Sequence, residues 1–243
     1  MCMKKKKIFK IVLIVLLGLV GLAVLITGYF AIRGAIMWNT AKKDLPIAQA
    51  AEQLRADADY IKFDDLPQFY VNAVVSVEDR RFWEHSGISV KSILRAAFYD
   101  LKTQSLDQGG STITQQLAKN VWFSQEKTIE RKFAEVFAAF SLEKELTKSE
   151  IFELYANSIY FGSDYYGIGE ASKGYFGKDP SELTEYECVL LAGLPNAPSA
   201  YSLNDAPELA KQRAEIVLQA MRDNGKLTEE QAEEVLKQGE SGE

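Results

Sequence analysis

The sequence predicts a mainly α-helical domain that follows one membrane-spanning helix near the N-terminus. Residues 11–32 carry no charge and are dominated by Val, Leu and Ile, and a run of about 20 such residues spans the hydrocarbon core of a bilayer. Several later segments repeat apolar residues at the 3.6-residue period of an amphipathic helix. We find no long alternating pattern typical of β-strands and no internal repeat.

The charges are divided unevenly along the 243 residues. Residues 1–33 hold six of the 28 Lys and Arg residues and none of the 34 Asp and Glu residues. The remainder is therefore acidic, which is atypical of proteins that bind nucleic acid, and we expect no nucleic-acid partner. Any anion site in the acidic part must be a local cluster of cations, for which Lys119, Arg131 and Lys132 are the candidates.

Cysteine and histidine usage argues against a zinc centre. Cys2 precedes the apolar run and Cys188 lies far beyond it, so we expect them on opposite sides of a membrane and unpaired. His85 is the only histidine, and there is no CxxC pattern. We interpret Cys188, which lies in an apolar run, as a small buried hydrophobic residue.

The apolar run is interpreted as a retained anchor. The alternative, a signal peptide, has an apolar core of about 7–15 residues and a small-residue cleavage site. Here the run is longer and continues into Tyr29, Phe30 and Trp38, which suit a membrane interface. The N-terminal lysines predict that the N-terminus is cytoplasmic and the rest lies outside. The expected organisation is a basic segment 1–10, a transmembrane helix 11–33, a connector 34–60, a main domain 61–238 and a polar tail 239–243.

Two segments carry candidate catalytic residues. The apolar run Val71–Val77 leads directly into Glu78 and Asp79, which places two acids at the edge of a core. Acids in a solvated first helical turn are the alternative, and both readings remain open. Gly109 and Gly110 precede Ser111-Thr112, and Thr112 with Gln115 matches a capping box, so a helix with an anion-binding start is expected near Ile113. One face of that helix carries Gln116, Lys119 and Asn120.

Further helices are expected along the chain. The clearest is Thr128–Leu146, whose apolar stripe consists of Ile129, Phe133, Val136, Phe137 and Phe140. Arg131 and Glu135 form an i,i+4 pair beside it, which on spacing alone could be a surface ion pair. We also expect a helix over Ile88–Leu101 followed by a loop to Gln108, a glycine-punctuated turn over Tyr165–Gly169, and a chain break over Leu194–Pro198. The remaining helices are expected over Glu150–Tyr160, Ala171–Phe176, Glu182–Leu194, Ala206–Gly225 and Thr228–Gln238.

Five ordered motifs lie over roughly residues 60–200. They are Glu78-Asp79-x-x-Phe82-x-x-His85-x-Gly87, Gly110-Ser111-Thr112-Ile113-Thr114-Gln115-Gln116 with Lys119-Asn120, Arg131-Lys132-x-x-Glu135, Lys148-x-x-Ile151-x-Glu153-x-Tyr155-x-Asn157, and Ala192-Gly193-Leu194-Pro195-x-Ala197-Pro198. These motifs resemble those of the peptidoglycan glycosyltransferases of the penicillin-binding-protein type, glycosyltransferase family 51. Two positions depart from the family pattern: Ser89 stands where many members have Asp, and Ala156 where the fourth motif usually has Leu.

The resemblance implies a lysozyme-like, two-lobed helical fold, polymerisation of lipid II into β-1,4-linked glycan strands with release of undecaprenyl pyrophosphate, and sensitivity to moenomycin. It implies that residues 61–238 form the glycosyltransferase domain on the outer face of a bacterial cytoplasmic membrane. The implied partners are lipid II, the growing glycan strand and the bilayer, with transpeptidases and other cell-wall synthesis proteins as further candidates. No cofactor is implied as required. Stimulation by Mg²⁺ or Mn²⁺ is left open, and the metal ligands are unknown.

The resemblance also implies roles for individual residues. Glu78 matches the general base and Glu135 the second essential carboxylate, whose role stays open among orienting Arg131, holding a cation and assisting departure of the leaving group. The matches to pyrophosphate and substrate contacts are Ser111, Thr112, Gln116, Lys119, Asn120 and Arg131. Supporting positions are Asp79, Phe82, His85, Gly110 and Lys132, and His85 is interpreted as a hydrogen-bonded structural residue.

Three alternatives remain for comparison. A lytic transglycosylase or lysozyme would share the fold and a catalytic Glu, but its leaving group is a sugar and needs no Lys119/Arg131 cluster. A non-catalytic scaffold would be favoured by loss of Glu78 or Glu135, and both are present. A bifunctional penicillin-binding protein is not expected, because the sequence lacks Lys-Thr-Gly and leaves no room for a transpeptidase domain.

Overall fold

The computed structural model of the chain describes residues 2–91, 110–124 and 126–240. Within these ranges the chain is helical, and its one β-type pairing is an isolated bridge between Tyr160 and Tyr166. The mainly helical prediction is therefore confirmed. The helices are α1 (Cys2–Asp44), α2 (Ile47–Arg55), α3 (Gln68–Glu78), α5 (Ile113–Trp122), α6 (Ile129–Glu145), α7 (Lys148–Ala156), α8 (Gly167–Phe176), α9 (Glu185–Gly193), α10 (Pro207–Asp223) and α11 (Glu229–Glu240), with short 3₁₀ turns at Phe63–Asp65, Pro180–Glu182 and Leu194–Asn196.

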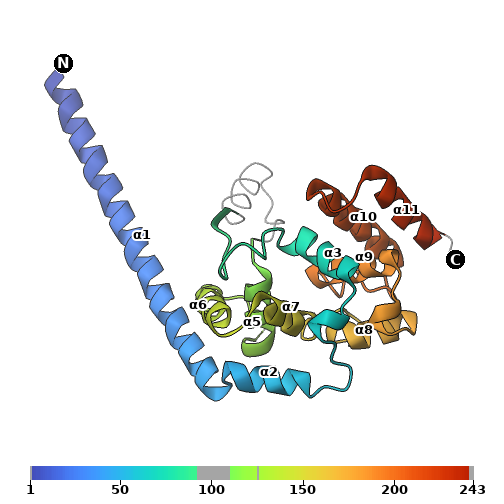
Figure 1. Cartoon of the computed structure of the whole chain (residues 1–243). Coiled ribbons are helices and arrows are strands. Elements are labelled where there is room, and N and C mark those ends of the chain that lie inside the picture. The colour runs from blue at the N-terminus through green and yellow to red at the C-terminus, as the bar shows by residue number, and fades with distance from the viewer. Residues whose placement is uncertain (1, 92–109, 125, 241–243) are drawn as a thin grey trace.

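The N-terminal helix α1 projects from the other helices as a long rod (Figure 1). In the described part of the chain it is the one helix long and apolar enough to cross a membrane. It does not stop at residue 33, the predicted end of the transmembrane helix, but continues without a break to Asp44. Its last turns pack against α6, and Trp38 is 3% exposed. The segment after the apolar run is therefore part of the folded body.

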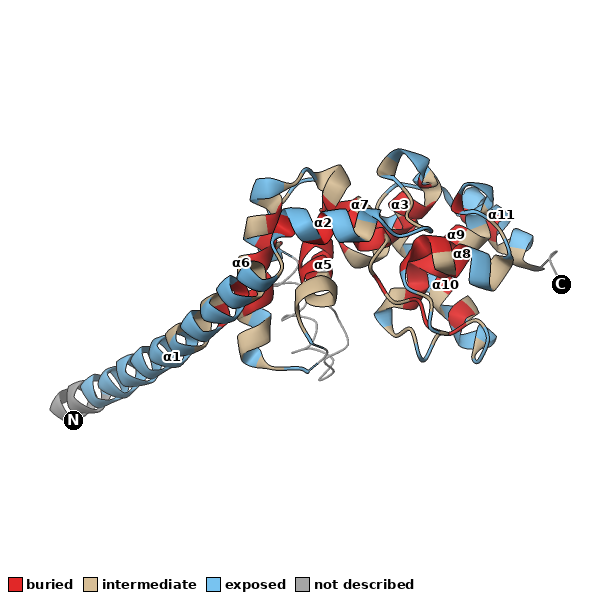
Figure 2. Cartoon of the chain, turned by 90° about the horizontal axis from the view of Figure 1, so that it is seen from below, coloured by how far each residue is buried: buried red, intermediate tan, exposed pale blue. Residues whose placement is uncertain are grey.

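The remaining helices form two groups, of which one lies beside the C-terminal part of α1 and the other lies farther from it (Figures 1 and 2). In one group α5 packs against α6 and α7; in the other α3, α9 and α10 pack on one another, with α11 against α9. The core is continuous through both groups and includes Tyr70 of α3 and Phe152 of α7, each fully buried. These groups correspond to the two lobes that the resemblance implies.

Several helix boundaries differ from those predicted. The helix expected over Glu150–Tyr160 runs instead from Lys148 to Ala156, because Thr147 caps its start and the chain turns after Asn157. The turn expected over Tyr165–Gly169 is in part the beginning of α8. A 3₁₀ turn at Pro180–Glu182 separates α8 from α9, which begins later than expected, after Thr184. Most of the helix expected over Ile88–Leu101, and the loop after it, lie outside the described residues.

The apolar stripe predicted for α6 is only partly covered, with Phe137 packed against the core. The buried residues of this helix are Ala134, Glu135, Ala138, Ala139 and Leu142, whereas Ile129 and Phe140 are 57% and 45% exposed. The large apolar residues lie toward α1 and the outer surface. The buried face of α6 instead consists of small alanines, Leu142 and Glu135.

Candidate active site

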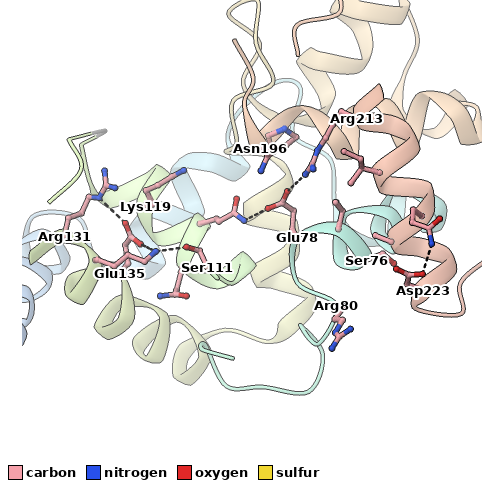
Figure 3. Close-up of a pocket in the computed structure, with 18 residues that line it drawn as sticks. Ser76, Glu78, Arg80, Ser111, Lys119, Arg131, Glu135, Asn196, Arg213 and Asp223 are labelled. Atoms are coloured by element: carbon pink, nitrogen blue, oxygen red, sulfur yellow. Dashed lines mark hydrogen bonds and ion pairs between the residues drawn. The ribbon is translucent and has the colours of Figure 1, made fainter. Parts of the chain in front are cut away.

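A cleft of about 530 Å³ lies between the two helix groups (Figure 3). One wall is formed by α5, α6 and Ser111, which lies two residues before the start of α5. Its opposite wall is formed by the end of α3, the Pro195-Asn196 turn and α10. The polar residues that line it are Ser76, Glu78, Arg80, Ser111, Gln115, Gln116, Lys119, Arg131, Lys132, Glu135, Asn196, Arg213, Gln219 and Asp223.

Glu78 lies at the centre of the cleft as the last residue of α3. The helix begins after Pro67, and its apolar residues pack in the core, so its end is fixed at the cleft. One carboxylate oxygen, Oε2, accepts a hydrogen bond from Gln116 Nε2 at 2.7 Å. The other, Oε1, lies 3.7 Å from Arg213 Nη2. The side chain is 11% exposed, so the carboxylate is held in one position with contact to the cleft.

Glu135 organises a cation cluster on the first two turns of α6. Its carboxylate is 2% exposed and contacts Arg131 Nε at 3.1 Å and Lys132 Nζ at 2.6 Å. The Arg131 contact is an ion pair without the alignment of a hydrogen bond. Lys132 Nζ also donates to Ser111 Oγ at 2.6 Å, and Arg131 Nη1 donates to the Ser124 carbonyl at 3.0 Å. The predicted i,i+4 pair is thus a buried element of the site.

Lys119 of α5 extends into the same cleft. Burial lowers the pKa of its ammonium group, an effect that Glu135 opposes and that Arg131 and Lys132 reinforce. Among the described residues it has no hydrogen-bond or ion-pair partner, because Glu135 is already engaged by its two α6 neighbours. A desolvated cation beside two further cations favours binding of a multiply charged anion.

The start of α5 is not the open anion site that we expected. The capping box is confirmed, since Thr112 Oγ1 accepts from Gln115 N and Gln115 Oε1 accepts from Thr112 N. However, the Ile113 amide donates to Asp79 Oδ2 at 3.2 Å. Thr112 is 1% exposed, and its hydroxyl donates to the Gly87 carbonyl at 2.6 Å. The backbone groups are thus used to join the first motif to the second.

The supporting residues of the first motif form a buried scaffold. His85 Nε2 lies 2.8 Å from Asp79 Oδ2, which confirms the prediction of a hydrogen-bonded His85. Phe82 is fully buried, and Lys148 Nζ lies 4.4 Å from the centre of its ring. Gly87 has φ +94°, and an added Cβ would lie 3.1 Å from the Ala139 backbone of α6, so this position requires glycine.

The fourth motif also has a packing role. Glu153 accepts hydrogen bonds from Tyr60 Oη at 2.5 Å and Phe63 N at 2.8 Å. Asn157 exchanges two hydrogen bonds with the backbone of Ile61, at 2.8 and 2.7 Å. These contacts attach the segment before α3 to α7, and so stabilise the approach to Glu78.

The cleft therefore unites only some of the predicted site residues. Among the described residues that line it are Glu78, Ser111, Gln116, Lys119, Arg131, Lys132 and Glu135. Those that lie outside this lining are Asp79, Phe82, His85, Gly110, Thr112 and Asn120. Within the described ranges, no group of three or more His, Cys, Asp or Glu side chains is placed to hold a metal ion.

Arg213 is a cleft residue that was not predicted from the sequence. Its guanidinium reaches Glu78 from α10, and its Nε donates to the Gly193 carbonyl at 3.4 Å. An added Cβ on Gly193 would lie 2.9 Å from Arg213 Cγ, so the glycine of the fifth motif leaves space for this side chain. Arg213 itself belongs to no motif, and sequence spacing alone could not pair it with a residue 135 positions earlier.

The fold and the cleft define a helical domain with a carboxylate and a cation cluster in one cleft, beside a long apolar helix. A family model described as transglycosylase matches residues 45–222. The chain belongs to the transglycosylase family.

Two similar sequences support this assignment. The chain is 46% identical over 177 residues to penicillin-binding protein 1A of Aquifex aeolicus, covering 73% of this chain and 24% of that protein. It is 42% identical over 198 residues to a Cupriavidus necator protein named as a transglycosylase, covering 82% of this chain and 85% of that protein. The chain thus spans about a quarter of the first relative and most of the second. A crystal structure of penicillin-binding protein 1A from Haemophilus influenzae matches 73% of this chain and 17% of that chain, at 24% identity and a TM-score of 0.44.

Proposed function

We propose that this protein is a membrane-anchored peptidoglycan glycosyltransferase that polymerises lipid II into β-1,4-linked glycan strands. Family membership and the penicillin-binding relatives support the reaction class. The observation that carries the proposal is the placement of Lys119, Arg131 and Lys132 in the same cleft as Glu78. A carboxylate suits proton removal from an alcohol, and a cation cluster suits a pyrophosphate leaving group.

The proposed reaction is a displacement at the anomeric carbon of the growing strand. The 4-hydroxyl of the acceptor's terminal sugar attacks that carbon while Glu78 accepts the hydroxyl proton. A new C–O bond forms, and the bond between the anomeric carbon and the pyrophosphate oxygen breaks with inversion. The electron pair leaves with undecaprenyl pyrophosphate, whose increasing negative charge is balanced by Lys119, Arg131 and Lys132.

The contacts of Glu135 support a positioning role for this residue. It is almost fully buried and engages Arg131 and Lys132 at once, so it fixes the two cations toward the cleft. Gln116 and Arg213 position Glu78 in turn, because each contacts one of its carboxylate oxygens. Because side chains supply the positive charge, we propose that no resident metal is required. Stimulation by Mg²⁺ or Mn²⁺ would then act through the substrate's pyrophosphate.

The proposed location is the cytoplasmic membrane, with α1 crossing once and the catalytic domain on the outer face. The cations before the apolar run support this orientation. Lipid II, the growing strand and the bilayer are the proposed partners, and transpeptidases would use the product strands.

The test is incubation of detergent-purified protein with labelled lipid II, followed by separation of the products on a gel. The proposal predicts a ladder of polymer that moenomycin suppresses. A lytic transglycosylase would instead release soluble fragments from finished cell wall and leave lipid II unpolymerised. A scaffold would do neither.

A further inference from the structure

The contact between α1 and α6 begins immediately beyond the apolar run. Gly34 is the second residue after that run, and an added Cβ there would lie 2.5 Å from Phe133 Cβ, 2.8 Å from Ala134 N and 2.9 Å from Glu130 O. In contrast, a Cβ added to Gly28 would meet nothing within 4 Å. At Gly34 the backbones of the two helices are therefore in direct contact, and glycine is the residue that permits it.

The contact continues along both helices in the same direction. One turn later, Trp38 Nε1 donates to Ser141 Oγ at 2.9 Å, and Trp38 packs edge-on against Trp122 of α5. A turn beyond that, Lys42 pairs with Glu145. Because residue numbers increase together in the two helices, α6 begins at the level of Gly34 and extends away from the apolar run. This junction is closely packed, and it includes both helices that carry the cation cluster.

The position of the junction can be related to the bilayer. The uncharged run of residues 11–32 is about 33 Å long at about 1.5 Å per residue, close to the roughly 30 Å hydrocarbon core. Arg33 and Gly34 then lie at the boundary with the headgroup layer. The first two turns of α6, which carry Arg131, Lys132 and Glu135, lie at the same level. Ile129, which begins α6 and is 57% exposed, supplies apolar surface at that level.

We propose that α1 sets the height of the cation cluster above the bilayer, and that its contact with α6 at Gly34 is the positioning element. This inference rests on the proposed function, because a lipid-linked substrate carries its pyrophosphate in the headgroup layer. A helix that only retained the domain at the membrane would need no such contact. The packed junction instead holds the cation cluster at the level of the substrate's pyrophosphate.

A flexible insertion separates the two roles of α1. Gly-Ser-Gly-Ser inserted between Arg33 and Gly34 keeps the anchor and leaves residues 34–44 packed on the domain. The height of the cation cluster above the bilayer is then no longer fixed by the membrane-spanning part of α1. The matched control places the same four residues between Lys10 and Ile11, on the other side of the apolar run. We expect the first variant to polymerise lipid II in liposomes about tenfold more slowly than the parent. Its rate in detergent and both rates of the control should stay within about twofold of the parent. Equal liposome rates for the two insertion variants would overturn the proposal.

Depth measurements test the same claim without activity. Single cysteines at Ile129 and Glu52, in a Cys2→Ser background, would carry a fluorophore in liposomes that contain lipid-borne quenchers. Glu52 lies on α2, beyond the end of α1. We expect strong quenching at position 129 by shallow quenchers and weak quenching at position 52. Equal, weak quenching at both would overturn the proposal. If the insertion also slows the reaction in detergent, the rates no longer isolate the effect of height, and the quenching measurement decides between the outcomes. A parent that does not polymerise lipid II in detergent would instead refute the proposed function and leave the depth result to test the height.

Discussion

At the scale of single residues, the site depends on how two carboxylates of different exposure are held. Glu78 lies between an amide and a guanidinium with access to the cleft, whereas Glu135 is enclosed by two cations. The first arrangement suits a group that exchanges a proton with substrate. The second suits a group that orients its neighbours. Sequence spacing identified both carboxylates, but only their surroundings separate the roles.

Replacing Glu78 by Gln tests the proposed base. The amide keeps the size of the side chain but cannot accept the acceptor's proton, so we expect polymerisation of lipid II to fall by at least about 10²-fold. The melting temperature should change little, because Glu78 lies at the edge of the core. Glu215→Gln, an exposed position on α10, is the matched control. Activity of Glu78→Gln within a few-fold of the parent would remove this residue from the proposed role.

Replacing Lys119 by Met separates substrate binding from stability. Burial lowers the Lys119 pKa from its ordinary value of 10.5, so the unfolded state binds more protons than the folded state between the lowered pKa and 10.5. The free energy of unfolding therefore rises as pH increases through that window, and the cost of the buried charge is fully present at neutral pH.

Lys119→Met should accordingly keep or slightly raise the melting temperature at pH 7. We expect the polymerisation rate to fall by about 10²-fold or more, because a donor to the leaving group is lost. Calorimetry and the lipid II assay provide the two measurements, with exposed Lys226→Met as the control. A clear loss of stability with normal activity would show that Lys119 is structural.

At the scale of elements, the connection between the first and second motifs depends on the cap of α5. Thr112→Ala removes the bonds to Gly87 O and Gln115 N. The expected cost is about 1–2 kcal/mol, the upper range for a helix cap, and a decrease of several degrees in melting temperature. Thr112→Ser keeps the hydroxyl and should retain most of the stability. If the Ala and Ser variants melt together, the hydroxyl does not join the motifs.

Structural features that depend on residues a few positions apart were predicted from the sequence better than those that depend on contacts between distant segments. The cap at Thr112, the start of α6 after Thr128 and the Arg131–Glu135 pair were all predicted from spacing of a few residues, and each is present. The apolar stripe of α6 was predicted, but its spacing did not indicate that α1, from far earlier in the chain, would pack against this helix. The prediction that the start of α5 is free to bind an anion was wrong. The Ile113 amide instead donates to Asp79, which lies 34 positions earlier in the chain.

At the scale of the whole molecule, the helical class was predictable from periodicity, but the relation of the anchor to the domain was not. A charged, Ala-rich segment after a transmembrane run is typical of a connector, and nothing in its composition indicates that Trp38 is buried against α5 and α6. The same limit applied to Arg213, which reaches Glu78 only when α10 packs on α3. Contacts between distant helices set both features.

Two truncations test the integration of α1. Deleting residues 1–33 should leave the melting temperature and the detergent rate nearly unchanged, because residues 34–44 still pack on α6. Its liposome rate should fall much more. Deleting residues 1–45 also removes Trp38, and burial of such a side chain contributes about 3–5 kcal/mol. We therefore expect this second protein to be markedly less stable. Equal melting temperatures for the two truncations would contradict the packed junction, and equal losses of rate in detergent and liposomes would contradict membrane targeting by α1.

The most direct test of glycan polymerisation is the stoichiometry of the reaction. Doubly labelled lipid II, with one label in the lipid and one in the sugar, would be incubated with the full-length protein. Released undecaprenyl pyrophosphate would then be counted against newly formed β-1,4 bonds. Transfer between sugars predicts one lipid pyrophosphate released per bond formed, with both products abolished together in Glu78→Gln. Release of lipid pyrophosphate without new glycosidic bonds, or no release at all, would contradict the account.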